Sequence, residues 1–347
     1  MPKVSTVTLS SVLDAREVTL PNFDKQYLDD VSFVTAMTLV LMGNYCQTGH
    51  FGGPLAYTPY TVASHLIGPE LGGLKYDYRR PKHPFSDKFM LAGGHNAPVT
   101  YALWMVLGEA LYRKHQATGD KKYLADYDQT LLPIDCIGFR RSKKGMETIL
   151  SENGLTEHPS MKQAKVRGIR ALSGHSESTD VTNDVNGGPS GIGIATAAGK
   201  ATFWDIIGAP ESPKVMAVEG EFAMTSGHSQ EMKTQAVAQQ VGKRLRVLMS
   251  YNNAGIDDEL VGGVIQPQYD SYRIVDQWTS YGWNVFTVED ANDMEQVVAA
   301  FKAMEDTDTS ERRPRILVGK TTKGWWPGPE NGPDPGNGNT KTNLTIH

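Results

Sequence analysis

Short apolar runs alternate with stretches of helical spacing along most of this 347-residue chain. Apolar runs of this kind are typical of strands buried in a parallel sheet, and residues that recur at three and four positions indicate helices. The alternation of the two predicts an α/β fold, with a mainly parallel sheet covered by helices on both faces. We expect strands at 87–92, 214–218, 245–249, 281–288 and 314–320, and helices at 27–45, 97–112, 229–240 and 293–304, with another helix beginning at 60.

Three parts of the chain depart from this regular pattern. Gly49 to Pro54 is rich in glycine and predicts a turn between two helices. Residues 114–170 are more polar and irregular, which indicates an elaborated connection. Residues 327–347 are rich in glycine, proline and asparagine without apolar periodicity, so we expect a flexible tail after a single domain at 1–326.

Composition excludes several classes of function. The formal net charge is −5, and no cluster of basic residues is interleaved with aromatic ones, which argues against binding nucleic acid or a membrane. Neither a secretion signal nor an apolar run long enough to span a membrane is evident, so we expect a cytoplasmic protein. Cys46 and Cys136 lack the spacing of a metal site, and we expect buried free thiols.

Two neighbouring strands are expected to end in polar residues suited to a cation. The strand at 214–218 leads into Glu219-Gly220-Glu221, and the strand at 245–249 leads into Asn252-Asn253. Ligands bind at the carboxyl ends of the strands in parallel α/β sheets. Mg²⁺ takes carboxylate, amide and carbonyl oxygens and leaves positions for phosphate oxygens and water. These residues taken alone are equally consistent with two ordinary turns, because acidic and Asn-Gly turns are common.

A glycine-rich segment provides a second candidate binding element. Gly187 to Gly193 precedes a helix rich in small residues, whose amino terminus is able to approach an anion closely. His95 falls at another junction, between the strand at 87–92 and the helix at 97–112.

Several segments, read in order, resemble the signature motifs of transketolases. They are Gly49-His50-Phe51-Gly52-Gly53-Pro54-Leu55, the run from Asp87 to His95, Ser173-Gly174-His175-Ser176-Glu177, Gly187 to Gly193, the acidic and asparagine turns, and Gly282-Trp283-Asn284-Val285. The resemblance covers about residues 30 to 326. Residues 154–159 also resemble the homodimeric pyruvate dehydrogenases, and residues 320–325 resemble the segment that closes the same domain in transketolases and phosphoketolases.

The resemblance implies a thiamine-diphosphate enzyme that transfers a two-carbon ketol unit from a ketose to an aldehyde. Transketolases also contain a pyrimidine-binding domain with the glutamate that activates the cofactor, and this sequence has no counterpart of it. We therefore expect the diphosphate-binding subunit of a split transketolase, active only in a heterotetramer with a separately encoded pyrimidine-binding subunit. The family's phosphate-recognising residues lie mostly in that other domain, so the donor and its phosphorylation stay open.

The same resemblance implies roles for individual residues. His50, His95 and His175 match the histidines that line the channel above the thiazolium ring, where imidazoles suit proton transfer. The residues expected to bind the cofactor are His95, Gly188, Pro189, Ser190, Gly191, Gly220, Glu221, Asn253 and Ile256. The residues expected to hold Mg²⁺ are Glu219, Asn253 and the Gly255 carbonyl.

Two of these assignments have alternatives. The family's metal-binding aspartate has no counterpart, because the turn reads Glu219-Gly220-Glu221; we favour Glu219 as the ligand over Glu221. Asn252 is the alternative to Asn253. Because glutamate is one methylene longer than aspartate, the site is also compatible with the less demanding Ca²⁺ or Mn²⁺. His228 either faces the site or caps a turn.

Two other functions compete with ketol transfer. A decarboxylating component of a 2-oxoacid dehydrogenase system is suggested by residues 154–159 and by the long connection at 114–170, and carbon dioxide release from pyruvate would identify it. A scaffold or regulatory subunit with a degenerate metal site would bind no cofactor even with its partner present.

Overall fold

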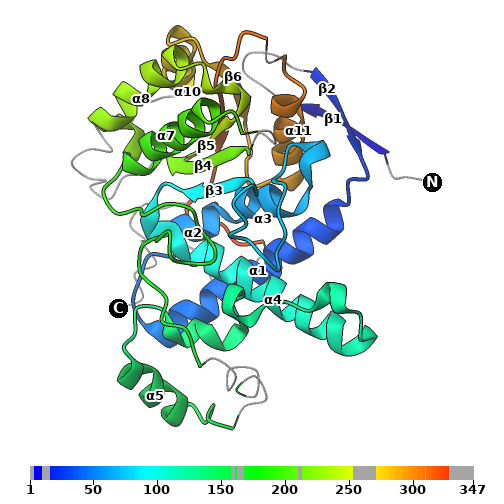
Figure 1. The fold of residues 1–347 in the computed structure, drawn as a ribbon, viewed down its shortest axis with the longest axis vertical. Helices are drawn as coiled ribbons and strands as arrows, with labels where there is room; N and C mark the ends of the chain where they lie inside the picture. The colour runs from blue at the N-terminus through cyan, green and yellow to red at the C-terminus, as the bar shows by residue number, and fades with distance from the viewer. Residues whose placement is uncertain are drawn as a thin grey trace.

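The computed structural model describes residues 4–9, 16–157, 161, 168–209, 213–252, 271–308 and 310–327. Its centre is a five-stranded parallel sheet with the strand order β3-β4-β5-β7-β6 (Figure 1). These strands are β3 (Lys88–Leu91), β4 (Val215–Gly220), β5 (Leu245–Tyr251), β6 (Asn284–Val288) and β7 (Arg315–Lys320). The predicted α/β class and all five predicted strands are confirmed.

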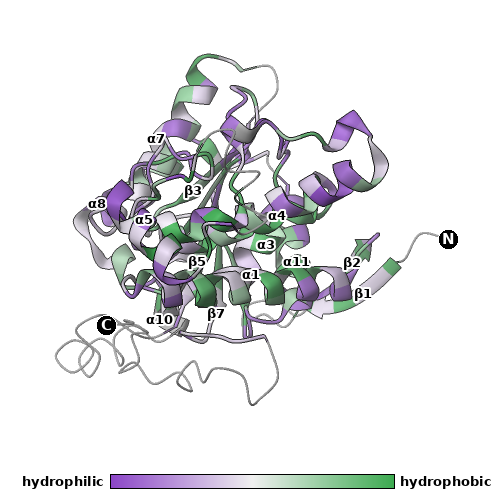
Figure 2. Ribbon diagram, turned by 90° about the horizontal axis from the view of Figure 1, so that it is seen from below, coloured by the Kyte–Doolittle hydropathy of each residue, from purple (hydrophilic) through white to green (hydrophobic). Residues whose placement is uncertain are grey.

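Helices cover both faces of the sheet because successive strand residues point to opposite sides. Met216 and Val218 of β4 pack on one face, whereas Val215 and Ala217 pack on the other. One face is covered by α1 (Lys25–Cys46), α2 (Gly52–Ala56), α3 (Thr58–Leu66), α4 (Ala97–Thr118) and α11 (Met294–Glu305), and the other by α7 (Ile192–Ile206), α8 (Gly227–Ala238) and α10 (Ser271–Ser280). Figure 2 shows hydrophobic residues concentrated on the central strands, with hydrophilic residues prevailing at the outer end of α4.

Several elements differ from the sequence expectations. An antiparallel hairpin, β1 (Val4–Leu9) and β2 (Arg16–Pro21), packs beside α11. The turn at 49–54 contains the start of α2, and α4 runs on to Thr118. The connection at 114–170 contains α5 (Lys143–Glu152) and three short 3₁₀ helices, η3 (Lys121–Tyr123), η4 (Tyr127–Gln129) and η5 (Pro133–Gly138). Elsewhere in the described residues the short 3₁₀ helices are η1 (Pro69–Leu71), η2 (Gly94–Asn96), η6 (Ala223–Thr225) and η7 (Val241–Lys243).

The expected free thiols are confirmed. Cys46 and Cys136 are both buried and unbridged, and the Cys46 thiol donates to the Cys136 carbonyl at 3.3 Å. Burial raises the pKa of Cys46 to about 11 and that of Cys136 to about 12, which makes both thiols unreactive. Within the described ranges no helix has the length and apolar character to cross a membrane. Of the expected tail, residues 328–347 lie outside the described residues.

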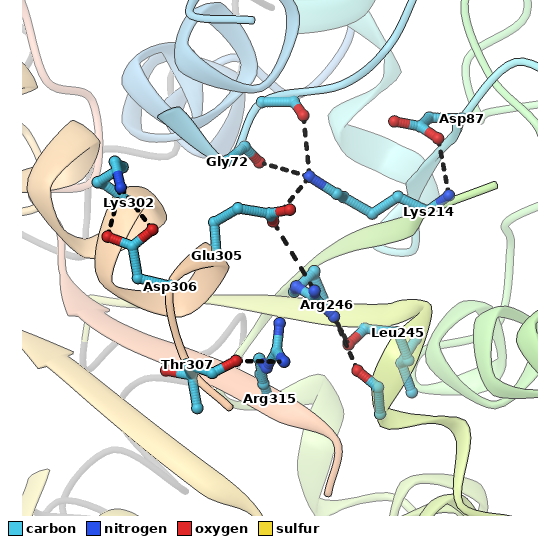
Figure 3. A network of polar contacts seen from close by, with 12 residues as sticks. Gly72, Asp87, Lys214, Leu245, Arg246, Lys302, Glu305, Asp306, Thr307 and Arg315 are labelled. Carbon is cyan, nitrogen blue, oxygen red and sulfur yellow. Dashed lines mark hydrogen bonds and ion pairs between the residues drawn. The ribbon is translucent and has the colours of Figure 1, made fainter. Parts of the chain in front are cut away.

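A cluster of charged residues lies at the amino edge of the sheet (Figure 3). Lys214 precedes β4, Arg246 lies at the start of β5, and Arg315 begins β7; all three are buried. The Lys214 ammonium donates to Glu305 at 3.0 Å and to the carbonyls of Gly72 and Gly73. The network ties α11 to the starts of three strands, at the edge opposite the strand ends considered below.

A buried lysine that forms no ion pair with the carboxylates of the described residues joins α8 to α10. The Lys233 ammonium donates to the side-chain oxygens of Gln230 at 3.1 Å and Gln277 at 2.8 Å, and it lies 4.7 Å from the centre of the Trp278 ring. Lys233 is 1% exposed, and burial lowers its pKa from 10.5 to about 8.

This shift predicts a pH-dependent stability. Between pH about 8 and 10.5 the folded state releases the Lys233 proton while the unfolded state keeps it, so the free energy of unfolding rises with pH through this window. Replacing Lys233 with methionine is expected to remove that rise. Urea denaturation of both proteins from pH 7.5 to 10.5 measures it, and parallel curves for the two proteins would contradict the assignment.

Candidate functional site

A cavity of about 320 Å³ opens at the carboxyl ends of the strands. Gly93 to His95 follow β3, Glu219 and Gly220 end β4, Asn252 follows β5 and Lys323 follows β7. The residues around the cavity are His50, Phe51, Gly52, Gly53, Tyr57, His95, Asn96, His175, Gly188, Ser190, Glu219, Gly220, Glu221, Phe222, Ala223, Asn252 and Lys323. The three predicted histidines, both glutamates and part of the glycine-rich segment therefore share one site.

Close backbone packing brings His95 and His175 together. The Ser176 N–H donates to the Gly94 carbonyl at 2.9 Å, and the Gly187 N–H donates to the Ser176 carbonyl at 2.8 Å. A Cβ on Gly94 would lie 2.0 Å from the Gly187 carbonyl oxygen, so only glycine allows this approach. The segments around 94, 176 and 187 are thereby held side by side.

Two of these histidines, His50 and His95, are weakly basic. The rings of His50 and His95 pack edge to face, with centroids 5.6 Å apart. His95 reaches solvent through the cavity but is closely surrounded by protein, and this burial lowers its pKa to about 4, with the charges of His50, His175 and Lys323 acting in the same direction. Burial also lowers the pKa of His50, and the charges of Arg140, His175 and Lys323 lower it further. His50 and His95 are therefore mainly neutral at pH 7 and able to accept a proton.

Glu219 presents a buried carboxylate oxygen to the cavity. Its side chain is 1% exposed; Oε1 accepts the Gly220 N–H at 2.9 Å, whereas Oε2 has no hydrogen-bond partner in the described part of the chain. Burial raises its pKa to about 7, and Glu221 adds to the rise although the N–H groups of Gly220 and Gly191 oppose it. A buried, unpartnered carboxylate oxygen at a cavity is suited to a cation.

The other candidate metal ligands are only partly covered by the structure. Glu221 is buried and Asn252 half-buried, and both line the cavity. Asn253, Gly255 and Ile256 lie outside the described residues. No group of three His, Cys, Asp or Glu side chains suited to a metal occurs within the described ranges. The donors that are present, a carboxylate with an adjacent amide oxygen, fit a hard cation that also takes phosphate oxygens.

The glycine-rich segment leads into α7 beside this acidic turn. Gly188 and Ser190 line the cavity, while Pro189 and Gly191 flank them in the chain. Gly191 has a φ of +82°, and a Cβ there would lie 1.8 Å from the Ser226 hydroxyl oxygen, so glycine is required on both counts. The start of α7 thus lies close to the cavity, where a helix amino terminus favours an anion.

The structure adds residues that sequence reasoning missed. Tyr57 is buried, and a Cβ on Gly220 would lie 3.2 Å from its hydroxyl oxygen. Burial, followed by the charges of Glu219 and Glu221, raises the pKa of Tyr57 well above its usual value. The side-chain amide Nδ2 of Asn96, directly after His95, donates to the His95 Nε2 at 3.3 Å. Among the candidates left open, His228 is exposed on the first turn of α8 and is not among the residues lining the cavity.

Two kinds of comparison identify relatives of this chain. Residues 156–338 match the family model described as "Transketolase, thiamine diphosphate binding domain". Transketolase 1 of Candida albicans is 24% identical over 288 residues, which cover 80% of this chain and 34% of that protein. A transketolase of Geobacillus stearothermophilus is 24% identical over 309 residues, covering 86% of this chain and 37% of that protein.

Solved structures agree in fold. A Pichia stipitis transketolase mutant in complex with xylulose-5-phosphate superposes with a TM-score of 0.60 at 20% identity, covering 87% of this chain and 36% of that one. The chain thus spans about a third of the length of the curated relatives that it matches. On the family match over more than half of its residues, the chain belongs to the transketolase family and contains its thiamine-diphosphate-binding domain.

Proposed function

We propose that this chain is the diphosphate-binding subunit of a thiamine-diphosphate-dependent transketolase, which transfers a two-carbon ketol unit from a ketose to an aldehyde. The observation that carries the proposal is that His50, His95 and His175 line one cavity together with Glu219, whose Oε2 has no hydrogen-bond partner in the described part of the chain. Family membership supplies the cofactor, and the cavity supplies groups for the cation, the diphosphate and proton transfer.

The residues divide into two sets by chemistry. Glu219, with Asn252 or Asn253 and the Gly255 carbonyl, would hold Mg²⁺, and Ca²⁺ or Mn²⁺ also suit these oxygens. The backbone at Gly188, Gly191 and Gly220 would receive the diphosphate, with Pro189, Ser190, Glu221 and Ile256 beside it. Thiamine diphosphate, when bound, supplies the electron sink for cleavage next to a carbonyl. The three histidines would bind substrate oxygens and exchange protons with them, a role for which imidazoles are suited.

We propose further that a pyrimidine-binding domain on a separate subunit completes the enzyme, in a heterotetramer of two chains of each kind. The relatives, of which this chain covers 34% and 37%, contain further sequence beyond the part that it matches, which is consistent with the need for a second domain. A cofactor bound between two domains requires both for its contacts, so neither subunit alone would be active.

Reconstitution tests the proposal. The chain is co-expressed with the product of the neighbouring reading frame, and thiamine diphosphate is titrated calorimetrically into the chain and the complex, with Mg²⁺, with Ca²⁺ and with a chelator. We expect saturable, metal-dependent binding to the complex and ketol transfer from xylulose 5-phosphate to an aldehyde. Absence of binding by the complex would contradict the proposal and favour a scaffold, and release of carbon dioxide from pyruvate without ketol transfer would favour the decarboxylating component.

A further inference from the structure

The cavity is lined by both acidic and basic residues. Glu219 and Glu221 lie at the end of β4, whereas Lys323 lies among the cavity residues with the three histidines. Arg140, which comes from the distant segment after η5, acts on His50. None of the roles proposed above uses Lys323 or Arg140.

The position of Arg140 is fixed by contacts on both sides. The ring of its neighbour Phe139 packs on Phe51 with centroids 6.1 Å apart, directly beside His50 in the chain. The Arg140 N–H donates to the Leu172 carbonyl at 2.8 Å, and its Nε lies 3.0 Å from the point where a Cβ on Gly174 would be. The guanidinium stem thus lies between the segments that carry His50 and His175.

The backbone of Arg140 is strained. Its φ is +53°, in the left-handed region that costs a side-chain-bearing residue free energy and that clusters at functional sites. Its side chain is exposed and has no ion-pair partner among the described residues. Arg79, Arg113 and Arg244, by contrast, each contact a carboxylate. A strained, uncompensated arginine beside a cavity suggests a ligand rather than a structural bridge.

Lys323 reaches the same region from the other side. The Gly324 N–H donates to the Gly52 carbonyl at 2.8 Å, and the Lys323 Cγ lies 3.3 Å from the point where a Cβ on Gly52 would be. The lysine stem therefore packs two residues beyond His50. The charges of Arg140 and Lys323 both lower the pKa of His50, which agrees with their position near that ring.

We propose that Arg140 and Lys323 form an anion-recognising pair at the histidine side of the cavity, which binds a phosphate or carboxylate group of the substrate. The inference rests on the proposed function and deepens it. The family resemblance assigns phosphate recognition mostly to the pyrimidine-binding domain, whereas this pair would place part of the substrate selectivity in the present chain. Guanidinium and ammonium groups bind both anions through charge-assisted hydrogen bonds.

The test compares anionic and neutral ligands in the reconstituted complex saturated with thiamine diphosphate and Mg²⁺. Xylulose 5-phosphate, hydroxypyruvate and neutral xylulose are measured by equilibrium binding and by kcat/KM, for the wild type, Arg140→Gln and Lys323→Met. Glutamine suits the Arg140 backbone, because Gln47 and Gln240 have φ values of +52° and +55°. We expect the preference for the anionic ligand over xylulose to fall about 10- to 100-fold in each variant, as for loss of a charge-assisted hydrogen bond.

Arg141→Gln is the matched control. The Arg141 stem lies against Gly145 of α5, 3.3 Å from its Cβ position, away from Gly174, so this variant should keep the wild-type preference. If Arg140→Gln and Lys323→Met lose the preference for xylulose 5-phosphate alone, the pair is a phosphate subsite. If they lose the preference for hydroxypyruvate, it is a carboxylate subsite, and either result supports the pair.

Three outcomes would overturn the pair: no anion preference in the wild type, equal preferences in Arg140→Gln and Arg141→Gln, or weakened binding of thiamine diphosphate, which would make the cofactor the bound anion. If the wild-type complex prefers the anionic ligand but transfers no ketol unit, the proposed function fails while the anion site stands, because binding is measured separately from turnover.

Discussion

Replacing Glu219 with glutamine is expected to weaken metal-dependent binding of thiamine diphosphate by more than about 100-fold, beyond the loss seen when only a supporting residue of a metal site is removed. The same change should stabilise the chain without cofactor. The Glu219 carboxyl is 1% exposed and its Oε2 has no partner in the described part of the chain, so its charged form is costly to bury. Glutamine keeps the shape and removes the charge.

The pH dependence of this stabilisation has a definite sign. Burial raises the pKa of Glu219 from 4.5 to about 7, so the folded state holds the proton that the unfolded state releases. The penalty therefore grows as pH rises from about 4.5 to 7 and is constant above. Denaturation of wild type and variant without metal, at pH 5 and pH 8, should show the larger gain for Glu219→Gln at pH 8.

Glu221→Gln is the control that distinguishes the two alignments of the acidic turn. If Glu219 is the ligand, Glu221→Gln keeps most of the metal-dependent binding. Loss of binding only in Glu221→Gln would assign the cation to Glu221. Unchanged affinity in Glu219→Gln, together with reduced stability, would show that the Glu219 carboxyl is structural.

The sheet and its site-bearing ends were predictable because they depend on local patterns. Apolar runs such as 245–249 are too short for helices, and the polar residues that follow them fall at one edge of any parallel sheet. Motif order then predicted that His50, His95 and His175 share a site, and the cavity brings these side chains together. Their catalytic roles stay predictions.

Other parts depended on contacts between distant segments. Tyr57 reads as one more apolar residue near a helix start, and only its position over Gly220 brings its hydroxyl to the site. Arg140 lies in an irregular connection, so nothing local placed its stem against Gly174. Strands β1 and β2 have the alternating pattern of a strand, but their partner for packing, α11, is almost three hundred residues away in sequence.

Replacing Glu305 with glutamine is expected to have the largest effect on stability of the substitutions considered. Glu305 accepts from Lys214 at 3.0 Å and lies 3.8 Å from Arg246, both of which have side chains no more than 10% exposed (Figure 3). Arg315 is fully buried nearby and also feels its charge. Without the carboxylate, buried cations lose their counterion, which costs about 3–5 kcal/mol; because Glu305 is itself one-third exposed, we expect the lower end of this range.

Glu289→Gln provides the matched comparison at an exposed pair. Glu289 and Lys320 have side chains 49% and 43% exposed, so loss of this ion pair should change the free energy of unfolding by at most about 1 kcal/mol.

The contribution of Glu305 to stability depends on pH. Burial alone would raise the pKa of Glu305, but the charges of Lys214 and Arg246 hold it below its usual value. The stabilisation by Glu305 is therefore present at neutral pH and is lost as pH falls through that pKa. Urea denaturation at pH 7 measures both variants. Equal small losses would mean that water, rather than Glu305, compensates the cations at the amino edge of the sheet.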